Sequence, residues 1–265
     1  MLTLPKAKVT SPRGPSSDGR CPAPRHARSP RPHKIPLRPW LEHLLGHLPM
    51  ARAGADPEGI HQVRVAIARI RVWLEIGGWR VLHDDLRRLR AVAASVRDLD
   101  VQLGRNMPVS YAAELHAERA SARQALLAAL DDTRLESLVS ALGNMPPVRR
   151  RRARKSLARF ARRAMVRGRV LPRKDYARLH ALRRSVRRVR FALDWLGEPS
   201  DELVKLQDAL GEFGDVWVAF RRASRGRESS QVREHRGALK RELRVTAGAA
   251  RRAWKRARST LEGLA

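Results

Sequence analysis

The feature that most constrains this chain is a basic helical segment that occurs twice. The segment from His61 to Arg71 reads HQVRVAIARIR, and the segment from His180 to Arg190 reads HALRRSVRRVR, with His, Arg, Arg and Arg in the same register. A long-range repeat of this kind is typical of an internal duplication. We therefore expect two related halves that present one ligand with two matching walls.

Each copy separates charge from apolar surface, because successive residues of an α-helix advance by about 100°. The basic arcs hold His61, Arg64 and Arg71 in the first copy and His180, Arg183, Arg187 and Arg190 in the second. The neighbouring apolar arcs hold Ile60, Val63, Ile67, Ile70 and Leu74, and Leu179, Leu182, Val186, Val189 and Leu193. A solvated face usually mixes both signs of charge, whereas only Glu75 and Asp194 lie near these stripes. An anionic ligand is the simplest explanation, and a solvated face is the alternative.

The charge of the whole chain also indicates a polyanionic partner. The sequence has 56 Lys and Arg against 26 Asp and Glu, a formal net charge of +30. Between Val148 and Arg190 the only acidic residue is Asp175. Most of the cations are arginines, which can bind two phosphate oxygens at once and stay charged at physiological pH. This excess is far larger than solubility requires.

The chain is expected to fold as an all-α protein, since Ala, Leu and Arg recur with helical spacing and no sustained β alternation is present. Pro and Gly divide the sequence into segments. We expect helices over 37–49, 57–76, 79–103, 109–130, 133–142, 147–168, 174–196, 200–222 and 229–262. The break near Pro146 and Pro147 separates two helical bundles, residues 37–143 and 147–262, within one domain over 37–265.

The N-terminal residues 1–36 have a different composition, with Pro, Ser, Gly and scattered basic residues but no apolar period. Such a segment is typical of a disordered basic tail. The single cysteine, Cys21, lies in it, which excludes an intrachain disulfide and a cysteine zinc site. No segment is apolar enough to be a secretory signal or a membrane span. A cytoplasmic protein with no membrane association is expected.

A third basic element runs from Arg149 to Arg167. Its apolar side, which includes Ala153 and Ala164, is too small for a membrane-surface helix and better suited to packing against sister helices. Its basic side consists of Arg151, Lys155, Arg159 and Arg162. We expect these four residues to join the anion site.

A matched acidic position follows each stripe. Asp98 lies in the sequence VRDLDV and Asp215 in GEFGDV, at nearly the same offset from His61 and His180. Because carboxylates repel phosphate, these two residues are expected to anchor a neighbouring arginine by an ion pair rather than to touch the ligand.

Catalytic and metal-binding alternatives have little support. His61 and His180 are each followed three residues later by an arginine, whose positive charge opposes a metal cation. No phosphate-binding glycine loop, nucleophile elbow or paired-cysteine motif is present. Each histidine is expected either to donate a hydrogen bond to a phosphate oxygen or to cap its helix. No metal, no cofactor and no catalytic residue is expected.

Nucleic acid is the strongest rival ligand, because phosphate contacts alone give large, salt-sensitive affinity. However, proteins that bind single strands usually stack bases on exposed rings, and aromatics make up only 5% of this chain. Trp73, Phe160, Phe191, Trp195 and Trp217 occupy helical positions suited to packing. Nonspecific RNA or DNA binding therefore stays as the alternative function.

The two stripes, the VRDLDV element and the sequence LQDALGE from Leu206 to Glu212 resemble, in this order, the motifs of the CHAD family, the conserved histidine α-helical domain. The resemblance covers about residues 37–261. It implies a pseudo-twofold pair of helical bundles whose basic helices line a central groove. It also implies binding of inorganic polyphosphate, association with polyphosphate granules, and no enzymatic activity.

Carried over by position, the resemblance assigns polyphosphate binding to the basic residues of both stripes. Two positions depart from the family pattern: Ala68 replaces a usual arginine, which predicts a weaker first wall, and Gly214 replaces a usual asparagine. Asp98 and Asp215 are expected to give structural support. With the third basic element, the expected polyphosphate-binding residues are His61, Arg64, Arg69, Arg71, Arg151, Lys155, Arg159, Arg162, His180, Arg183, Arg184, Arg187, Arg188 and Arg190.

Overall fold

The computed structural model describes residues 33–172, 174–225 and 229–265. Within these residues the chain forms nine helices and one short pair of strands, so the expected all-α fold is confirmed. The elements are β1 (Lys34–Ile35), α1 (Arg38–Ala53), α2 (Pro57–Gly77), α3 (His83–Leu103), α4 (Val109–Leu130), α5 (Thr133–Gly143), β2 (Val148–Arg149), α6 (Arg150–Gly168), α7 (Tyr176–Leu196), α8 (Asp201–Ala223) and α9 (Ser230–Gly263).

The two stripe helices, α2 and α7, are built alike. Each has 21 residues and begins after an aspartate whose carboxylate accepts a backbone N–H, Asp56 from Glu58 and Asp175 from Arg178. Each ends at a glycine in the left-handed conformation, Gly78 with φ 71° and Gly197 with φ 66°. Such a side-chain cap and a left-handed glycine satisfy backbone groups that a helix end leaves unpaired.

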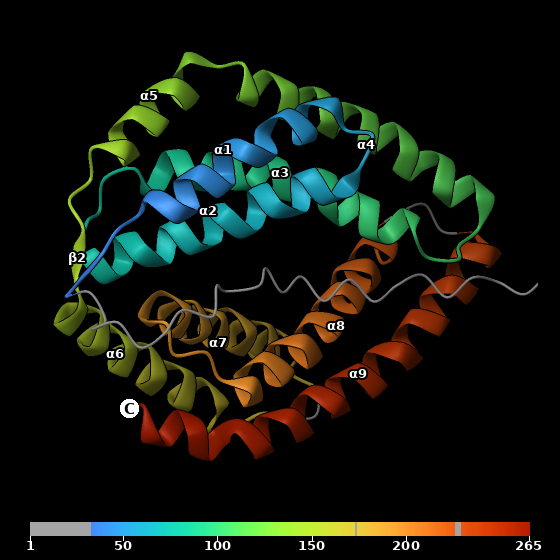
Figure 1. The fold of residues 1–265 in the computed structure, drawn as a ribbon. Coiled ribbons are helices and arrows are strands. Elements are labelled where there is room, and N and C mark those ends of the chain that lie inside the picture. Colours follow the sequence, from blue (N-terminus) through green and yellow to red (C-terminus); the bar gives the residue numbers. More distant parts are fainter. Residues whose placement is uncertain (1–32, 173, 226–228) are drawn as a thin grey trace, which may run out of the picture. The chain divides into compact units, whose positions relative to one another are not determined.

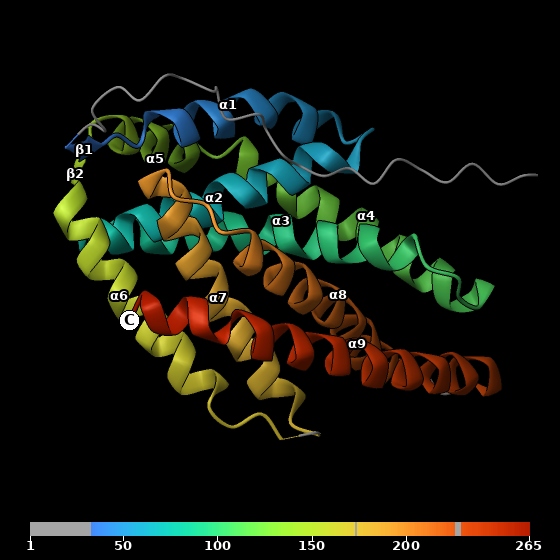
Figure 2. The ribbon, with the colours of Figure 1, turned by 60° about the horizontal axis from the view of Figure 1, so that its bottom comes forward.

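The helices form two bundles, α1–α5 and α6–α9, which lie on opposite sides of the molecule in Figures 1 and 2. Across the boundary α2 packs on α7 and α3 packs on α8. The short strands repeat this relation: β1 precedes α1, β2 precedes α6, and the two pair antiparallel through Lys34 with Arg149 and Ile35 with Val148. The two bundles are therefore related by a pseudo-twofold axis.

Both stripe helices bury their apolar arcs completely. Ile60, Val63, Ile67, Ile70 and Leu74 are at most 1% exposed, and the arc of α7 is at most 4% exposed. The indole of Trp73 is also buried and donates a hydrogen bond to the carbonyl of Ile35 (3.1 Å). This burial supplies the main stabilisation of each bundle and turns the basic stripes away from the core.

Most predicted helix boundaries agree with the structure, with two informative differences. The first helix continues through Pro49 to Ala53, because Leu48 and Ala51 remain buried and proline removes only one backbone donor. Helix α3 begins at His83 rather than at residue 79, since the glycine cap of α2 turns the backbone and Trp79 donates to the carbonyl of Leu74.

The expected N-terminal tail lies mostly outside the described residues, as does Cys21. The described part starts slightly before the expected boundary at residue 37, because Lys34–Ile35 forms β1 and Ile35 is buried. Over the described ranges, no helix combines the length and apolar character needed to span a lipid bilayer.

Candidate functional site

The boundary between the bundles encloses a cavity of about 450 Å³, which we call the central cavity. Its walls come from α2 and α3 of the first half and from α7 and α8 of the second half. Among the described residues, six arginines line it: Arg64, Arg90, Arg97, Arg183, Arg184 and Arg187. The arrangement brings the basic faces of the two repeated helices to one space.

Six of the residues expected from the stripes line the central cavity. Helix α2 contributes His61 and Arg64, and helix α7 contributes the other four. Ala68, which stands where the family pattern has an arginine, also lines it and leaves the position without charge. The lining residues from α7 are His180, Arg183, Arg184 and Arg187.

The two matched aspartates stand beside the stripe arginines. Arg64 Nη2 lies 3.3 Å from Asp98 Oδ1, and Arg183 Nη2 lies 3.6 Å from Asp215 Oδ1. Each aspartate comes from the helix that follows the stripe helix, so the contact ties α2 to α3 and α7 to α8. An ion pair of this type fixes the position of a guanidinium that would otherwise sample many rotamers.

Gly214 has a steric reason to lack a side chain. A Cβ atom built on Gly214 would lie 2.4 Å from Nη1 of Arg183. The guanidinium of Arg183 therefore rests directly against the backbone of α8, and a larger residue at position 214 would displace it.

Sequence reasoning missed Arg90 and Arg97 of α3, both of which line the central cavity. They are seven residues apart, so they share one helix face, and Arg97 immediately precedes Asp98. That spacing could have placed them beside the stripe. With them, each half contributes three arginines, and the first wall matches the second in formal charge despite Ala68.

The electrostatic environment of the central cavity disfavours further positive charge. Burial, followed by repulsion from Arg64, lowers the pKa of Arg90 to about 10. Burial and then repulsion from Arg90 lower the pKa of Arg187 to about 9. Burial and then Arg183 lower the pKa of His180 to about 4, so this imidazole is neutral at pH 7. A bound anion would relieve all three effects.

Two of the expected ligands, Arg69 and Arg188, lie outside the central cavity and connect the halves. Arg69 of α2 pairs with Asp194 of α7 and also lies over the rings of Trp40 and Phe191, at 4.2 and 4.6 Å. Arg188 of α7 pairs with Glu75 of α2 at 3.0 Å. These ion pairs occupy matching positions in the two repeats, and they neutralise both acids that the stripes contain.

Arg71 and Arg190 also lie outside the lining of the central cavity. Both are partly buried, and in the part of the chain that the structure describes the Nε atom of each has no hydrogen-bond partner. Burial lowers the pKa of Arg71, while nearby Glu75 raises it. Arg71 therefore lies beyond the end of the central cavity, near the Arg188–Glu75 pair.

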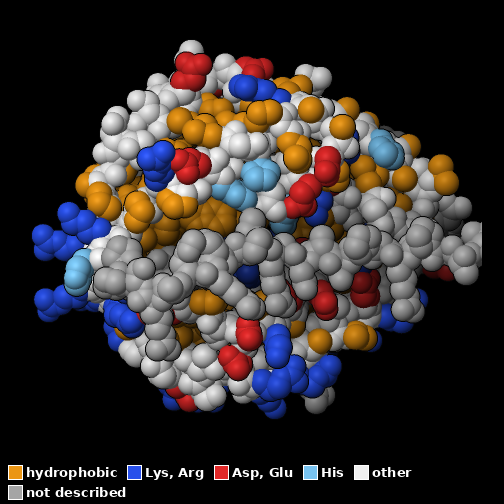
Figure 3. All heavy atoms as spheres, in the orientation of Figure 1, with side chains coloured by type: hydrophobic (Ala, Val, Ile, Leu, Met, Phe, Trp, Pro, Cys, Tyr) orange, Lys and Arg blue, Asp and Glu red, His pale blue; other side chains and the backbone are white. Residues whose placement is uncertain are grey.

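The third basic element forms a separate cavity, which we call the α6 cavity. Its volume is about 590 Å³, and Glu75 and Ile76 of α2, with the capping Gly78, form its opposite wall. Figure 3 shows blue Lys and Arg side chains over the half of the molecule built from α6–α9. The expected residues Arg151, Lys155, Arg159 and Arg162 thus lie together, joined by Arg149 and Arg152, but apart from the central cavity.

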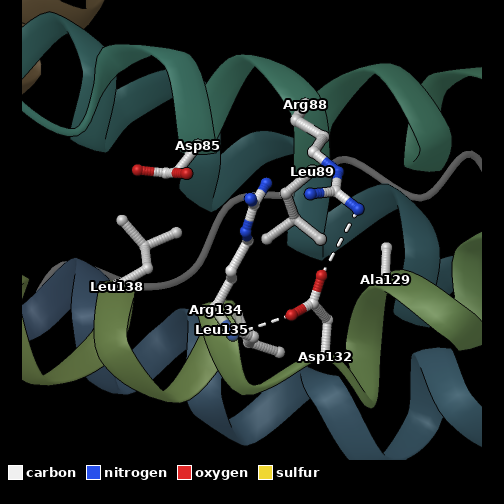
Figure 4. A pocket seen from close by; sticks show the side chains of 8 residues that line it. All are labelled: Asp85, Arg88, Leu89, Ala129, Asp132, Arg134, Leu135 and Leu138. Atoms are coloured by element: carbon white, nitrogen blue, oxygen red, sulfur yellow. Dashed lines mark hydrogen bonds and ion pairs between the residues drawn. The ribbon is translucent and has the colours of Figure 1, made fainter.

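A further cavity of about 510 Å³ is lined by His180 and by Arg221, Arg222 and Arg225, but it also holds Glu114 and Glu118, and Glu118 pairs with Arg222. Figure 4 shows a cavity between α3 and α5 where Arg88 lies 3.3 Å from Asp132, but its volume of about 30 Å³ leaves room for a water molecule or two. Over the described ranges, no three His, Cys, Asp or Glu side chains gather as metal ligands would.

The solved structures most informative for comparison have the same fold. The crystal structure of the CHAD domain from the plant Ricinus communis aligns with a TM-score of 0.69 and 23% identity over 82% of this chain and 88% of that chain. PptA from Streptomyces chartreusis aligns with a TM-score of 0.68 and 20% identity over 83% of this chain and 96% of that chain. No curated protein matches the sequence.

A match between the sequence and a family model identifies the family. The CHAD domain family model matches residues 37–224, which include both stripe helices, both matched aspartates and every residue that lines the central cavity. Helix α9 lies beyond the match, although it packs along α8 and completes the second bundle. The duplicated helices, the cavity between them and the extent of this match together assign the fold, and the chain belongs to the CHAD domain family.

Proposed function

We propose that the central cavity binds inorganic polyphosphate without catalysing its cleavage. The observation that carries the proposal is the convergence of six arginines from two repeated walls on one cavity. Burial and, after it, mutual repulsion lower the pKa values of Arg90 and Arg187, and a bound anion in the cavity would offset this cost. Family membership supports the same ligand class.

The form of the cavity favours a linear chain of phosphates. A chain running between the walls meets guanidinium groups on both sides, and each group can donate two hydrogen bonds to phosphate oxygens. His61 and His180 lie in the same cavity, and the neutral His180 can donate one hydrogen bond. Asp98 and Asp215 hold Arg64 and Arg183 in position.

The same geometry argues against nucleic acid as the preferred ligand. Trp73, Phe160 and Phe191 are at most 4% exposed, so they offer no surface for base stacking. Trp217 is partly exposed but packs against Tyr176 and Phe220, with ring centroids 5.4 and 6.2 Å away. Nonspecific RNA or DNA binding by surface charge is the rival function.

Competition tests the proposal against this rival. The full chain is held on labelled RNA at physiological salt and titrated with long-chain polyphosphate or with unlabelled RNA at equal phosphate concentration. Displacement by polyphosphate at concentrations at least 100-fold lower supports a cavity shaped for bare phosphate. Equal competition contradicts the proposal, since it means that charge alone is recognised.

A variant pair locates the binding. The central variant R64Q/R183Q/R187Q should lose most polyphosphate affinity and keep its helicity. The control K240Q/R241Q/R244Q removes the same charge from exposed positions on α9 and should lower affinity only slightly.

Affinity should also fall steeply with salt, because binding releases counterions. Polyphosphate hydrolysis that depends on His61 or His180 would contradict the noncatalytic assignment.

A further inference from the structure

The α6 cavity differs from an ordinary solvated basic face in how its cations are partnered. Arg150 and Arg154, on the same helix, share Glu198 at 2.7 Å each. Among the described residues, no Asp or Glu side chain pairs with any of the six exposed cations of the cavity, which are Arg149, Arg151, Arg152, Lys155, Arg159 and Arg162. Arg162 donates a hydrogen bond to the oxygen of Ala265 at the end of the chain. Glu198 thus neutralises Arg150 and Arg154 outside the cavity, whereas the cations inside the cavity keep their charge uncompensated by Asp or Glu.

The wall of the cavity opposite α6 adds no uncompensated negative charge. Glu75, its one acidic lining residue, is paired with Arg188. Arg152 lies against the end of α2, since a Cβ atom on Gly78 would come within 2.1 Å of its Nη2 atom. Two walls therefore enclose a cavity of about 590 Å³, and the positive charge is concentrated on one of these walls.

One stripe of α2 connects the central cavity to the α6 cavity. His61, Arg64 and Ala68 line the former and Glu75 lines the latter, with Arg71 between them at helical spacing. From Ala68 to Glu75 is seven residues, or about 10 Å along the helix axis. Arg71 adds positive charge along this path, and Arg188 balances the charge of Glu75 there.

The pseudo-twofold axis does not reproduce this cavity. Helix α1 stands in the first half where α6 stands in the second, but its first three turns carry Trp40, His43 and His47 instead of a row of cations. The ring of Trp40 covers Arg69 there. A polyanion leaving the central cavity toward α6 therefore finds continued positive charge. The cavity beside His180, in contrast, combines Arg221, Arg222 and Arg225 with Glu114 and Glu118.

We propose that the α6 cavity is a second phosphate-binding site, which takes the continuation of a polyphosphate chain already held in the central cavity. The proposal rests on the proposed function of the central cavity. A short chain fills the central cavity alone, whereas a long chain occupies both, so the protein selects long polyphosphate over short. The chain would pass Arg71 and Arg188 on its way between the two sites.

The test compares tripolyphosphate with long-chain polyphosphate on three variants of the full chain. The variant R151Q/K155Q/R159Q should bind tripolyphosphate within twofold of the parent and long-chain polyphosphate about tenfold more weakly. The control K240Q/R241Q/R244Q, which removes the same charge from α9, should change the long-chain affinity by less than threefold. Circular dichroism checks that each variant remains helical.

The outcomes separate the two proposals. If the α6 variant weakens both ligands equally or neither of them, the second site is overturned and the central cavity is unaffected. If the α6 variant weakens RNA binding but leaves long-chain polyphosphate binding unchanged, the α6 cavity recognises nucleic acid and the proposal is overturned. If R64Q/R183Q/R187Q loses neither ligand, the central cavity fails as the primary site and this inference fails with it.

Discussion

The two halves of the molecule place equal numbers of arginines around the central cavity but take them from different helices. In the first half Arg64 comes from α2, while Arg90 and Arg97 come from α3. In the second half all three come from α7, and α8 contributes only uncharged or acidic side chains to the lining. The walls therefore match in formal charge although they differ in which positions carry it.

The differences fall at corresponding positions of the repeat. Ala68 stands where the second half has Arg187, and Gln207 stands where the first half has Arg90. A cavity that acts through its electrostatic potential tolerates such exchanges, because the field sums over all nearby charges. The two walls therefore keep the same number of arginines although only Arg64 and Arg183 occupy corresponding positions with a matched aspartate.

The largest expected effect is a difference between the two ion pairs that join the halves, in how much each contributes to the free energy of unfolding. The side chains of Arg69 and Asp194 are 13% and 20% exposed, whereas those of Arg188 and Glu75 are 36% and 23% exposed. R69M leaves Asp194 as an uncompensated, largely buried charge and should lower the free energy of unfolding by about 3 kcal/mol. R188M should cost about 1 kcal/mol.

Urea denaturation of the two variants measures this asymmetry. Adding D194N to R69M should recover part of the lost stability, because the isolated carboxylate is removed. Equal losses for R69M and R188M would mean that the two pairs contribute alike, and that the rings of Trp40 and Phe191 around Arg69 add nothing.

The next effect concerns one arginine from each wall. R187Q and R90Q each remove a buried positive charge, together with its repulsion from neighbouring arginines, and should raise the free energy of unfolding of the ligand-free protein by about 1 kcal/mol. Each should also weaken polyphosphate binding about tenfold, through the loss of a charged hydrogen-bond donor. Denaturation and direct binding titration measure the two quantities. A variant that loses both stability and affinity would show that its arginine supports the fold instead.

A smaller gain in polyphosphate affinity is expected when the first wall receives the arginine that the second wall already has. A68R places an arginine at the position that corresponds to Arg187 and should strengthen polyphosphate binding about threefold. It should also destabilise the ligand-free protein slightly, because a seventh arginine enters the central cavity. A68Q provides similar bulk without charge and should not improve affinity. Improvement by A68Q would indicate that packing, and not charge, limits the first wall.

Much of this architecture could be predicted from the sequence because it is local. The apolar arcs fixed the helices and their buried faces, and Gly78 and Gly197 marked the helix ends. The repeat of His61 and Arg64 at His180 and Arg183 correctly indicated a duplicated all-α fold. Helical periodicity, glycine punctuation and the internal repeat carry this information, and all three can be seen in the sequence.

The assignment of individual arginines could not be predicted, because it depends on packing between helices far apart in the sequence. Arg69 and Arg188 belong to the same repeated segments as the cavity arginines, but each forms an ion pair with an acidic residue of the opposite half. Arg90 and Arg97 enter the cavity only because α3 packs beside α2. Periodicity predicts which residues share one face of a helix, but it does not predict which helix packs against that face.

The smallest expected effect is a difference in pH response between the two histidines. The pKa of His180 is lowered to about 4 by burial and then by Arg183, Arg184 and Arg187, whereas Glu58 partly opposes the lowering for His61. Between pH 6.5 and about 4 the unfolded chain binds a proton at His180 that the folded chain does not. The free energy of unfolding should therefore fall as the pH drops through this window.

Polyphosphate should reverse this response, because its negative charge raises the pKa of His180 and the complex takes up the proton. Affinity should then rise as the pH falls from 7 to 5, and H180N should flatten both the stability profile and the affinity profile more than H61N does. Denaturation and binding titrations at matched ionic strength measure the two profiles. If H61N and H180N flatten them equally, the three arginines of α7 do not set the charge state of His180, and the two walls are electrostatically equivalent at their histidines.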